Sequence, residues 1–272
     1  MTKFLFFVLT FLLTVPVSAQ KKEKDFPRAV FVKNDGSEMN VLFVAYTYPT
    51  QPYLRFLKGT DILNFEYKLT PEGKTEKIKS DELQLVRFID QYEDEILGLE
   101  KLTMKAVNEN GKISEKSMVS WQPLLYDGKI KIYGSNSFMC ASDGNQCTYS
   151  LSKFYMKNAK DDYAVMPIDY DRLNLLNIWK ADERFIEAFK LVGKNCENFN
   201  NYVDTVYGQF QDKAFRKKMT AEIKEARKRG FEEAKAEKLR FNASQERVGL
   251  RVQEFYLNLY MGIIKEYEKN CP

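Results

Sequence analysis

Polar and apolar residues alternate along the chain between residues 28 and 168, in short runs rich in β-branched and aromatic side chains. Alternation with a period of two predicts β-strands that each have one buried face. Turn-forming residues such as Asn34-Asp35-Gly36 separate the runs, a spacing typical of an antiparallel sheet folded as a sandwich or an open barrel. Segment 80–94 fits either a short helix capped by Asp81 or a further strand over 83–88. The other predicted strands are residues 29–33, 40–46, 53–57, 62–69, 99–107, 113–121, 130–133, 147–156 and 163–166.

After Pro167 the apolar residues recur at intervals of three and four, which predicts amphipathic helices instead of strands. One helix is predicted over residues 182–192, where Gly193 follows as a C-terminal stop. A second is predicted from residue 196 to residue 210. The chain therefore changes from strands to helices near residue 168.

The last part of the chain predicts two further helices. Residues 212–240 are mostly Ala, Glu, Lys and Arg, which predicts a long charged helix. Asn242 and Gln245 have the spacing of a capping box, and the wide apolar face that follows them indicates a buried helix. The predicted fold class is therefore α+β, with an antiparallel β-rich module (20–168) followed by a helical module (169–272).

Residues 1–19 have the features of a secretory signal peptide. The basic Lys3 precedes an apolar stretch over residues 4–15, and the small residues Val17-Ser18-Ala19 would allow cleavage before Gln20. No later stretch approaches the ~18 apolar residues of a membrane-spanning helix. We therefore expect an exported protein that is not transmembrane after cleavage, in the periplasm or at the surface of a Gram-negative type of envelope. The alternative is an uncleaved N-terminal anchor.

Four cysteines follow the predicted cleavage site: Cys140, Cys147, Cys196 and Cys271. An even number in an oxidising compartment predicts two disulfides, for which three pairings are possible. The turn-forming residues 143–145 favour Cys140–Cys147, which leaves Cys196–Cys271 as the second pair. Free buried thiols and a metal site are the alternatives, and the spacing is a poor match to a zinc site.

The chain contains no histidine, while 44% of its residues are hydrophobic and 29% are charged, a globular composition. The missing histidine excludes Ser-His-Asp and Cys-His catalysis, the HExxH motif and any zinc site built on histidine. Carboxylate, lysine and tyrosine chemistry remain, and these leave weak sequence signatures.

The chain carries 42 basic and 38 acidic residues, and the excess of positive charge gathers in residues 212–240, with eleven basic and six acidic side chains. This segment could bind anionic lipid headgroups, a cell-wall polymer or an acidic partner. The alternative is a solvated helix with i→i+4 ion pairs such as Glu225–Arg229. Nucleic acid is not an expected ligand of an exported chain. The candidate anion-binding residues are Arg216, Lys217, Lys218, Arg227, Lys228 and Arg229.

Neighbouring carboxylates occur at Asp161-Asp162, at Asp169 and Asp171, and within residues 90–95. Two such acids could catalyse glycoside hydrolysis, although Asp169 and Asp171 stand where helix caps are expected. No Ca²⁺-loop pattern and no phosphate-binding glycine-rich loop is found, and no metal or other cofactor is expected. One group of aromatic residues fits either a carbohydrate-stacking face or, preferably, the core of the sheet: Tyr46, Tyr48, Tyr53, Phe56, Phe65 and Tyr67.

Six short stretches have a familiar order along the chain: Asp35-Gly36, Pro52-Tyr-Leu-Arg-Phe56, Ser80-Asp-Glu-Leu83, Gly128-Lys-Ile-Lys-Ile-Tyr133, Phe154-Tyr-Met-Lys157 and the helix before Cys196. This order resembles that of a group of uncharacterised exported proteins of Bacteroidetes-type bacteria, over about residues 28–200. The last seventy residues lie outside the resemblance. The group has no assigned activity, so the resemblance implies export and a β-rich first half.

These observations favour a non-catalytic exported envelope protein, a binding or scaffolding subunit of a periplasmic or cell-surface assembly. Its partner would be another envelope protein, held by strand addition at a sheet edge or by packing on the C-terminal helices. One alternative is a carboxylate-dependent hydrolase that acts on envelope polysaccharide through Asp169 and Asp171. Another is a peripheral binder of anionic membrane or cell wall through the segment 212–240.

Overall fold

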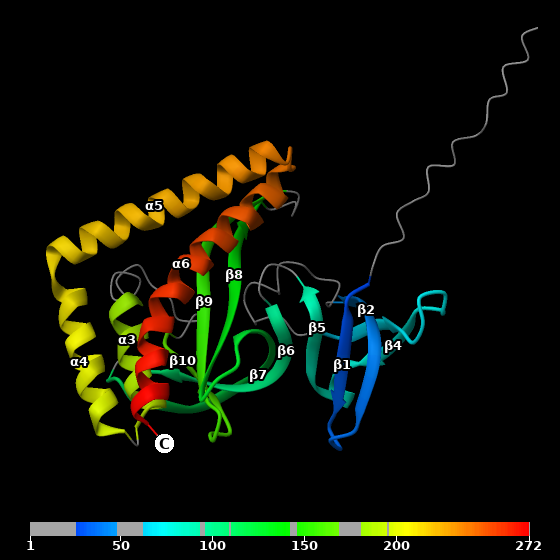
Figure 1. Ribbon diagram of the computed structural model, residues 1–272, viewed down its shortest axis with the longest axis horizontal. Coiled ribbons are helices and arrows are strands. Elements are labelled where there is room, and N and C mark those ends of the chain that lie inside the picture. Colours follow the sequence, from blue (N-terminus) through cyan, green and yellow to red (C-terminus); the bar gives the residue numbers. More distant parts are fainter. Residues whose placement is uncertain are drawn as a thin grey trace, which may run out of the picture.

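The computed structural model describes residues 26–47, 62–92, 96–108, 110–141, 146–168, 181–194 and 196–271. The predicted signal peptide, the predicted strand 53–57 and the acidic residues Asp169 and Asp171 lie outside the described residues. The described part has strands between Arg28 and Met166 and helices after them, so that the predicted α+β class is confirmed (Figure 1).

The described strands form one sheet, in the order β10-β9-β8-β7-β6-β5-β1-β2-β3-β4. All neighbours in this order are antiparallel. The strands are β1 (Arg28–Lys33), β2 (Glu38–Thr47), β3 (Asn64–Lys68), β4 (Glu76–Lys79), β5 (Leu83–Tyr92), β6 (Ile96–Val107), β7 (Ile113–Tyr126), β8 (Ile130–Cys140), β9 (Cys147–Asn158) and β10 (Ala164–Met166).

Strands β6 to β10 close into a five-stranded barrel, where the sequence predicted a sandwich or an open barrel. The short strand β10 makes the closure, because it pairs antiparallel with β9 and also parallel with β6, with Ala164 opposite Met104 and Met166 opposite Ala106. Parallel pairing with a strand so far away in the sequence leaves no local signature. The buried interior residues are Leu102, Met104, Ala106, Leu124, Tyr133, Tyr155, Ala164 and Met166.

Strands β1 to β5 form the other half of the sheet, which curls around a separate aromatic core. Phe43 packs edge-to-face on Phe88, with ring centroids 5.1 Å apart. Leu99 of β6 and Trp121 of β7 complete this core, so the two halves share the strands at their border. The ambiguous segment 80–94 forms strand β5, so the strand interpretation is confirmed. The alternative, a helix capped by Asp81, was wrong, because only a 3₁₀ turn at Ser80–Glu82 precedes β5 and its N-cap residue is Lys79.

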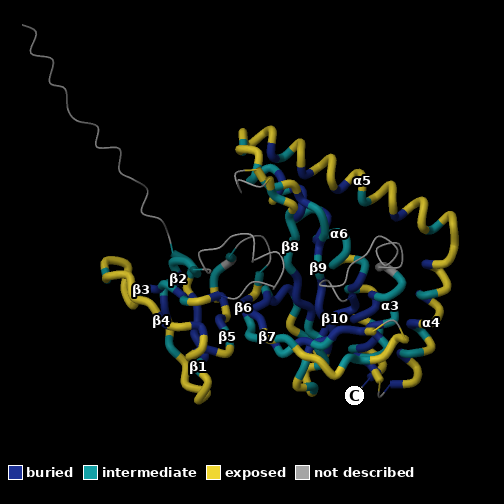
Figure 2. The backbone as a smooth tube through the Cα atoms, turned by 180° about the vertical axis from the view of Figure 1, so that it is seen from behind, coloured by how far each residue is buried: buried dark blue, intermediate teal, exposed yellow. Residues whose placement is uncertain are grey.

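The helices are α3 (Ala181–Val192), α4 (Glu197–Gln211), α5 (Lys213–Ala236) and α6 (Phe241–Asn270). Helix α6 crosses β8 and β9, and α3 lies against β9 and β10, so the helices cover the outside of the closed barrel (Figures 1 and 2). Phe185, Phe189 and Tyr260 pack there against Phe154 and Met156 of β9. The apolar faces of α3 and α6 are thus buried against the barrel, and that of α4 is buried against α3 and α6.

Helices α5 and α6 form a hairpin whose two arms lie closest near the turn. A Cβ atom at Gly230 would lie 2.7 Å from the Cα of Val248, so the close approach requires glycine there. Arg251 Nε donates to Glu233 Oε2 at 2.7 Å, and Arg229 contacts Glu254 of α6 at 2.9 Å. The predicted ion pair between Glu225 and Arg229 was therefore wrong, because Arg229 pairs with Glu254 on the neighbouring helix instead.

The predicted capping box at Asn242 and Gln245 was also wrong. Arg240 is the N-cap residue of α6, and neither amide caps the helix. Asn242 Oδ1 accepts a hydrogen bond from the backbone N–H of Cys147 at 2.9 Å, and Gln245 Oε1 accepts one from that of Tyr149 at 3.1 Å. Both N–H groups belong to the first part of β9, which β10 does not reach. The two amides therefore replace a strand along that edge.

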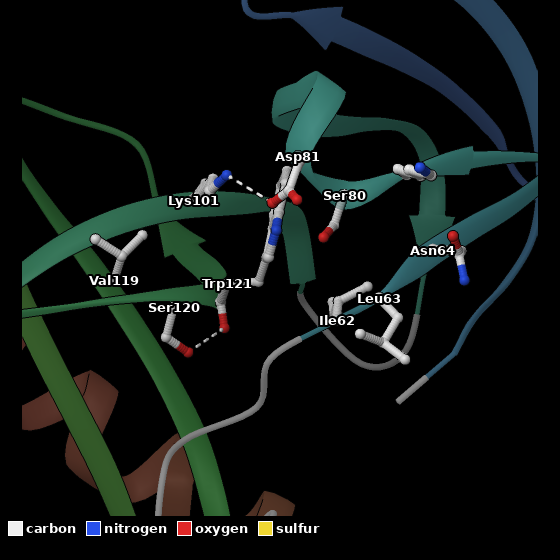
Figure 3. A pocket seen from close by; sticks show the side chains of 10 residues that line it. Ile62, Leu63, Asn64, Ser80, Asp81, Lys101, Val119, Ser120 and Trp121 are labelled. Atoms are coloured by element: carbon white, nitrogen blue, oxygen red, sulfur yellow. Dashed lines mark hydrogen bonds and ion pairs between the residues drawn. The ribbon is translucent and has the colours of Figure 1, made fainter. Parts of the chain in front are cut away.

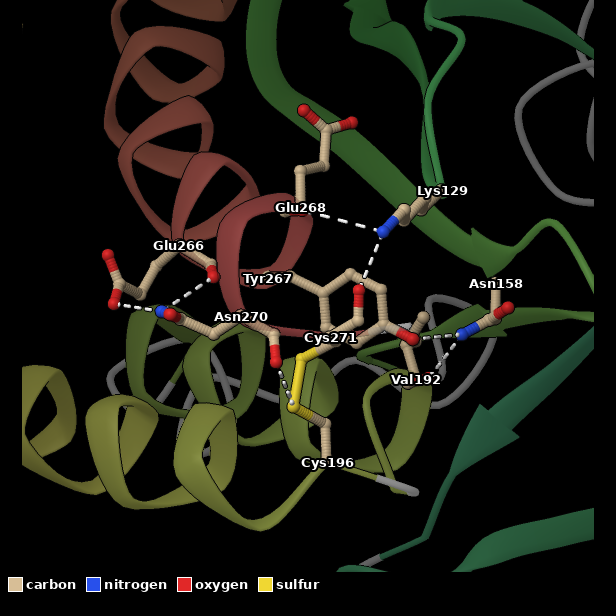
Figure 4. The surroundings of a disulfide bond; sticks show 9 residues. All are labelled: Lys129, Asn158, Val192, Cys196, Glu266, Tyr267, Glu268, Asn270 and Cys271. Carbon is tan, nitrogen blue, oxygen red and sulfur yellow. Dashed lines mark hydrogen bonds between the residues drawn. A yellow bond between two sulfur atoms is a disulfide. The ribbon is translucent and has the colours of Figure 1, made fainter.

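The structure forms both predicted disulfides, Cys140–Cys147 across the β8–β9 hairpin and Cys196–Cys271 between the start of α4 and the end of α6. Further hydrogen bonds surround the second disulfide (Figure 4). Lys129 Nζ donates to the carbonyl oxygen of Cys271 at 2.6 Å, and Asn158 Nδ2 donates to Tyr267 Oη at 2.9 Å. The end of α6 is thus fixed to the barrel as well as to α4.

Candidate functional site

A pocket of about 590 Å³ opens where the two halves of the sheet meet. Figure 3 shows residues of β6 and β7 on one side, with residues at the start of β3 on the other and the 3₁₀ turn above them. We call this the junction pocket. The residues that line it are Ile62, Leu63, Asn64, Lys79, Ser80, Asp81, Lys101, Val119, Ser120 and Trp121.

The floor of the junction pocket is aromatic and its rim is apolar. The indole ring of Trp121 is buried and meets Phe65 of β3 edge-to-face, with ring centroids 4.9 Å apart. On the rim, Leu63 is 48% exposed and Val119 is 51% exposed. These two side chains offer apolar surface to a ligand, since neither is buried by the fold.

Two lysines give the junction pocket its polar character. Lys101 Nζ lies 3.4 Å from Asp81 Oδ1, in a pair whose carboxylate side chain is 89% exposed. Lys79 makes no ion pair among the described residues. The buried Ser120 hydroxyl accepts a hydrogen bond from Gln122 Nε2 at 3.1 Å. The pocket can thus bind an apolar side chain beside a carboxylate, which a lysine would hold.

A second cluster of charged groups lies at the mouth of the closed barrel. Glu100 accepts hydrogen bonds from Tyr133 Oη at 2.8 Å and from Lys157 Nζ at 3.1 Å, while Lys131 Nζ lies 3.5 Å away. Burial, and next the charge of Glu100, raises the pKa of Tyr133 far above its ordinary value. This cluster left no sign in the sequence, because its members come from three strands. Its groups satisfy one another, which indicates a structural role.

The six candidate anion-binding residues all lie on α5 and are exposed. The six residues differ in the side chains that they contact. Lys218 lies 3.8 Å from Glu222, Lys228 is near two glutamates, and Arg229 is bound to Glu254 of α6. The guanidinium of Arg227 lies 5.7 Å from the centre of the Tyr149 ring. Arg216 and Lys217 have no ion pair among the described residues.

Two of the carboxylates noted in the sequence, Asp90 and Asp161, have basic partners. Asp90 binds Arg28 through a short ion pair of 2.7 Å, and the hydrogen bond from Arg28 lowers the pKa of Asp90 to about 2. Asp161 lies 3.3 Å from Lys194. Within the described ranges no three Cys, Asp or Glu side chains are grouped so that they could hold a metal ion. The hydrolase candidates Asp169 and Asp171 lie outside those ranges.

Part of the aromatic group noted in the sequence belongs to the core. Phe65 and Tyr67 are buried and pack against Phe31, with ring centroids 5.8 Å and 5.5 Å away. The preferred interpretation of these two aromatic side chains is therefore confirmed. Tyr48, Tyr53 and Phe56 lie outside the described residues.

The comparisons with known proteins were negative: no protein-family model, no curated protein and no solved structure matches the chain. Within the described part, no helix has both the length and the apolar character needed to cross a membrane. The function must therefore be argued from the geometry of the molecule.

Proposed function

We propose that the protein is an exported, non-catalytic binding subunit of an envelope assembly, and that a partner protein docks at the junction pocket. The partner segment would be extended and would carry an apolar side chain beside a carboxylate. The observation that carries this proposal is the junction pocket itself, which is lined by the exposed side chains of Leu63 and Val119 and by Lys79, which has no ion pair among the described residues.

The position of β4 supports docking by an extended segment. β4 is the last strand of the sheet and pairs with β3, with Lys79 opposite Asn64. No strand pairs with its other side among the described residues. An unpaired strand edge beside a pocket is the arrangement that β-strand addition uses, because backbone groups supply affinity and the pocket selects a side chain.

Other surfaces offer less to a partner. The first part of β9 is covered by Asn242 and Gln245 of α6, and β10 closes the barrel. The apolar faces of α3, α4 and α6 are buried in one core, in which α3 and α6 pack on the barrel and α4 packs on α3 and α6. Packing of a partner on the C-terminal helices would need an exposed apolar face, so the structure favours strand addition over helix packing.

The two disulfides support export. Disulfides persist in oxidising compartments such as the periplasm and are rare in the cytosol. The predicted signal peptide points to the same compartment. We therefore place the proposed assembly in the periplasm or at the cell surface of a Gram-negative type of envelope.

Two matched pairs of substitutions test the docking site in the native envelope. Leu63→Asp with Val119→Asp adds two charges to the junction pocket. Leu69→Asp with Ile89→Asp adds the same charges at exposed apolar positions outside it. A photo-crosslinking residue at position 101 would report the partner segment by mass spectrometry. We expect a crosslinked peptide that the first pair abolishes and the second pair retains.

Two results would overturn the proposal. One is a protein that elutes alone and monomeric under gentle conditions, with no peptide crosslinked at position 101. The other is an equal yield of crosslinked partner from both pairs of variants. Circular dichroism of each variant confirms that the fold is intact.

A further inference from the structure

Helix α5 carries an eleven-residue repeat of basic side chains. Lys213, Lys224 and Lys235 follow one another at this interval, and Arg216-Lys217 recurs as Arg227-Lys228. Eleven residues make close to three helical turns, so that the repeated residues stay on one face. We call these seven residues the basic stripe: Lys213, Arg216, Lys217, Lys224, Arg227, Lys228 and Lys235.

The acidic residues of α5 lie outside the basic stripe. At 3.6 residues per turn, the basic stripe occupies an arc of about 120° that contains no acidic residue. The two other basic residues of the helix, Lys218 and Arg229, fall on the acidic side and contact Glu222 and Glu254. The acidic residues of α5 are Glu222, Glu225, Glu232 and Glu233.

Every residue of the basic stripe is exposed. Helix α5 lies along an outer edge of the molecule (Figures 1 and 2). Among the described residues, Lys213, Lys217, Lys224 and Lys235 take part in no ion pair. At 1.5 Å per residue the basic stripe is about 33 Å long.

Exposed apolar side chains lie at the end of the basic stripe. Phe231 belongs to the same face of α5 and is 48% exposed, and Phe241 begins α6 just after the turn. Met139, near the tip of the β8–β9 hairpin, is exposed as well. The hydrogen bond from Cys147 to Asn242 holds this tip beside the start of α6. Aromatic and apolar side chains beside basic ones are typical of surfaces that contact lipid headgroups.

We propose that the basic stripe binds an anionic lipid surface, with α5 lying flat on the headgroups and Phe231 entering their apolar boundary. The buried apolar face of α5 stays packed against α6, so the lysines and arginines supply most of the attraction, Phe231 adds to it, and binding is reversible. A soluble linear polyanion would also match the row of charges but gives no role to the exposed phenylalanines. This site is independent of the junction pocket.

The test uses the full mature chain and sedimentation with vesicles. The vesicles contain either 30% phosphatidylglycerol in phosphatidylcholine or phosphatidylcholine alone. We expect binding to the anionic vesicles only, and at least a tenfold weakening between 50 mM and 300 mM salt, because salt screens exposed charges. Replacement of four unpaired lysines of the basic stripe should also weaken binding at least tenfold: Lys213→Gln, Lys217→Gln, Lys224→Gln and Lys235→Gln.

A matched control removes four exposed lysines of the helical region that lie outside the basic stripe: Lys218→Gln, Lys238→Gln, Lys265→Gln and Lys269→Gln. Its net charge equals that of the test variant, and it should keep its affinity within threefold. Phe231→Ser should weaken vesicle binding, while binding to soluble polyglutamate should be at least tenfold weaker than to the vesicles. Far-ultraviolet circular dichroism checks the helix content of each variant.

Three results would overturn the proposal. The first is no binding to anionic vesicles at low salt. The second is an equal loss of affinity in the control variant, which would make net charge the cause. The third is polyglutamate binding as tight as vesicle binding with no effect of Phe231→Ser, which would identify a polymer site instead.

Discussion

The two halves of the sheet contain five strands each, yet they enclose their cores in different ways. In one half, the three residues of β10 pair on both sides and close the barrel. In the other half, β4 has a partner on one side only, and Trp121 from the neighbouring barrel strand completes the core. The closed half is covered by helices, while the open half leaves the junction pocket.

The difference also concerns where charges lie. The closed half holds Glu100 and its lysines at the mouth of the barrel, with 14% of the Glu100 side chain exposed. The open half keeps its ion pairs outside, as in Glu66–Lys77, where 62% of the lysine side chain is exposed. The closed barrel thus contains a buried network of charged groups, while the core of the open half is mainly aromatic and aliphatic.

Loss of the disulfide at the end of α6 should have the largest effect on the closed half. Cys196→Ser with Cys271→Ser opens a loop of 75 residues, and we expect the free energy of unfolding to fall by about 4 kcal/mol. Urea unfolding followed by circular dichroism measures it. Cys140→Ser with Cys147→Ser is the control and should lose less, because its separation is only 7 residues. A loss below about 1 kcal/mol in the first variant would contradict the loop-closure argument.

Substitution of one glutamate in each half compares a buried with an exposed ion pair. Glu100→Leu leaves Lys157 without its carboxylate and Lys131 with Asp127 alone, and it should cost about 3 kcal/mol of stability. Glu66→Leu in the open half removes a partner of the exposed Lys77 and should cost at most about 1 kcal/mol. Equal decreases in the free energy of unfolding for the two variants would show that the buried ion pair contributes no more than the exposed one.

Alkaline pH should weaken the attachment of α6 to the closed half. Burial, and next the hydrogen bond to Glu268, raises the pKa of Tyr126 to about 12 from an ordinary 10. A raised pKa favours the neutral form in the folded state, so its contribution is complete below pH 10 and is lost as the pH rises to about 12. We expect the free energy of unfolding to fall less steeply between pH 9.5 and 12 in Tyr126→Phe than in the unsubstituted protein. An equal pH dependence of the free energy of unfolding in the two proteins would show that Tyr126 is not its cause.

The smallest effect should come from the exposed pair that joins β1 to β5 in the open half. The hydrogen bond from Arg28 lowers the pKa of Asp90 to about 2, so any stability it provides is present above about pH 4 and lost as the pH falls toward 2. Arg28→Ala should return the pKa of Asp90 toward the ordinary value. Carboxyl NMR titration measures the shift directly, and an unchanged pKa would show that Arg28 is not its cause.

The strand and helix periods could be read from the sequence because each depends on neighbouring residues. The strand predicted at 130–133 continues to Cys140, since its polar residues pair with β9 along their whole length. Barrel closure by β10 could not be read in this way, because it depends on pairing over a long sequence distance. The same reason hid Glu100, whose partners lie on β8 and β9.

The junction pocket is formed by four separate segments, so no single motif indicates it. The basic stripe, in contrast, is present in the sequence as a regular interval. The interval of eleven residues also relates Lys218 to Arg229, so these two residues are separated from the other candidates by their angle around the helix. The number of charges in residues 212–240 shows the excess of positive charge but not that the basic residues share one face of the helix.

The amides of Asn242 and Gln245 have a consequence for how the chain avoids aggregation. While α6 is not yet in place, the first part of β9 presents unpaired backbone N–H groups, which are a template for a strand from another molecule. Once α6 docks, its side chains occupy these groups without adding a strand that a second copy could extend. We therefore expect a chain with a poorly formed α6 to associate with itself through the β8–β9 hairpin before it loses its barrel.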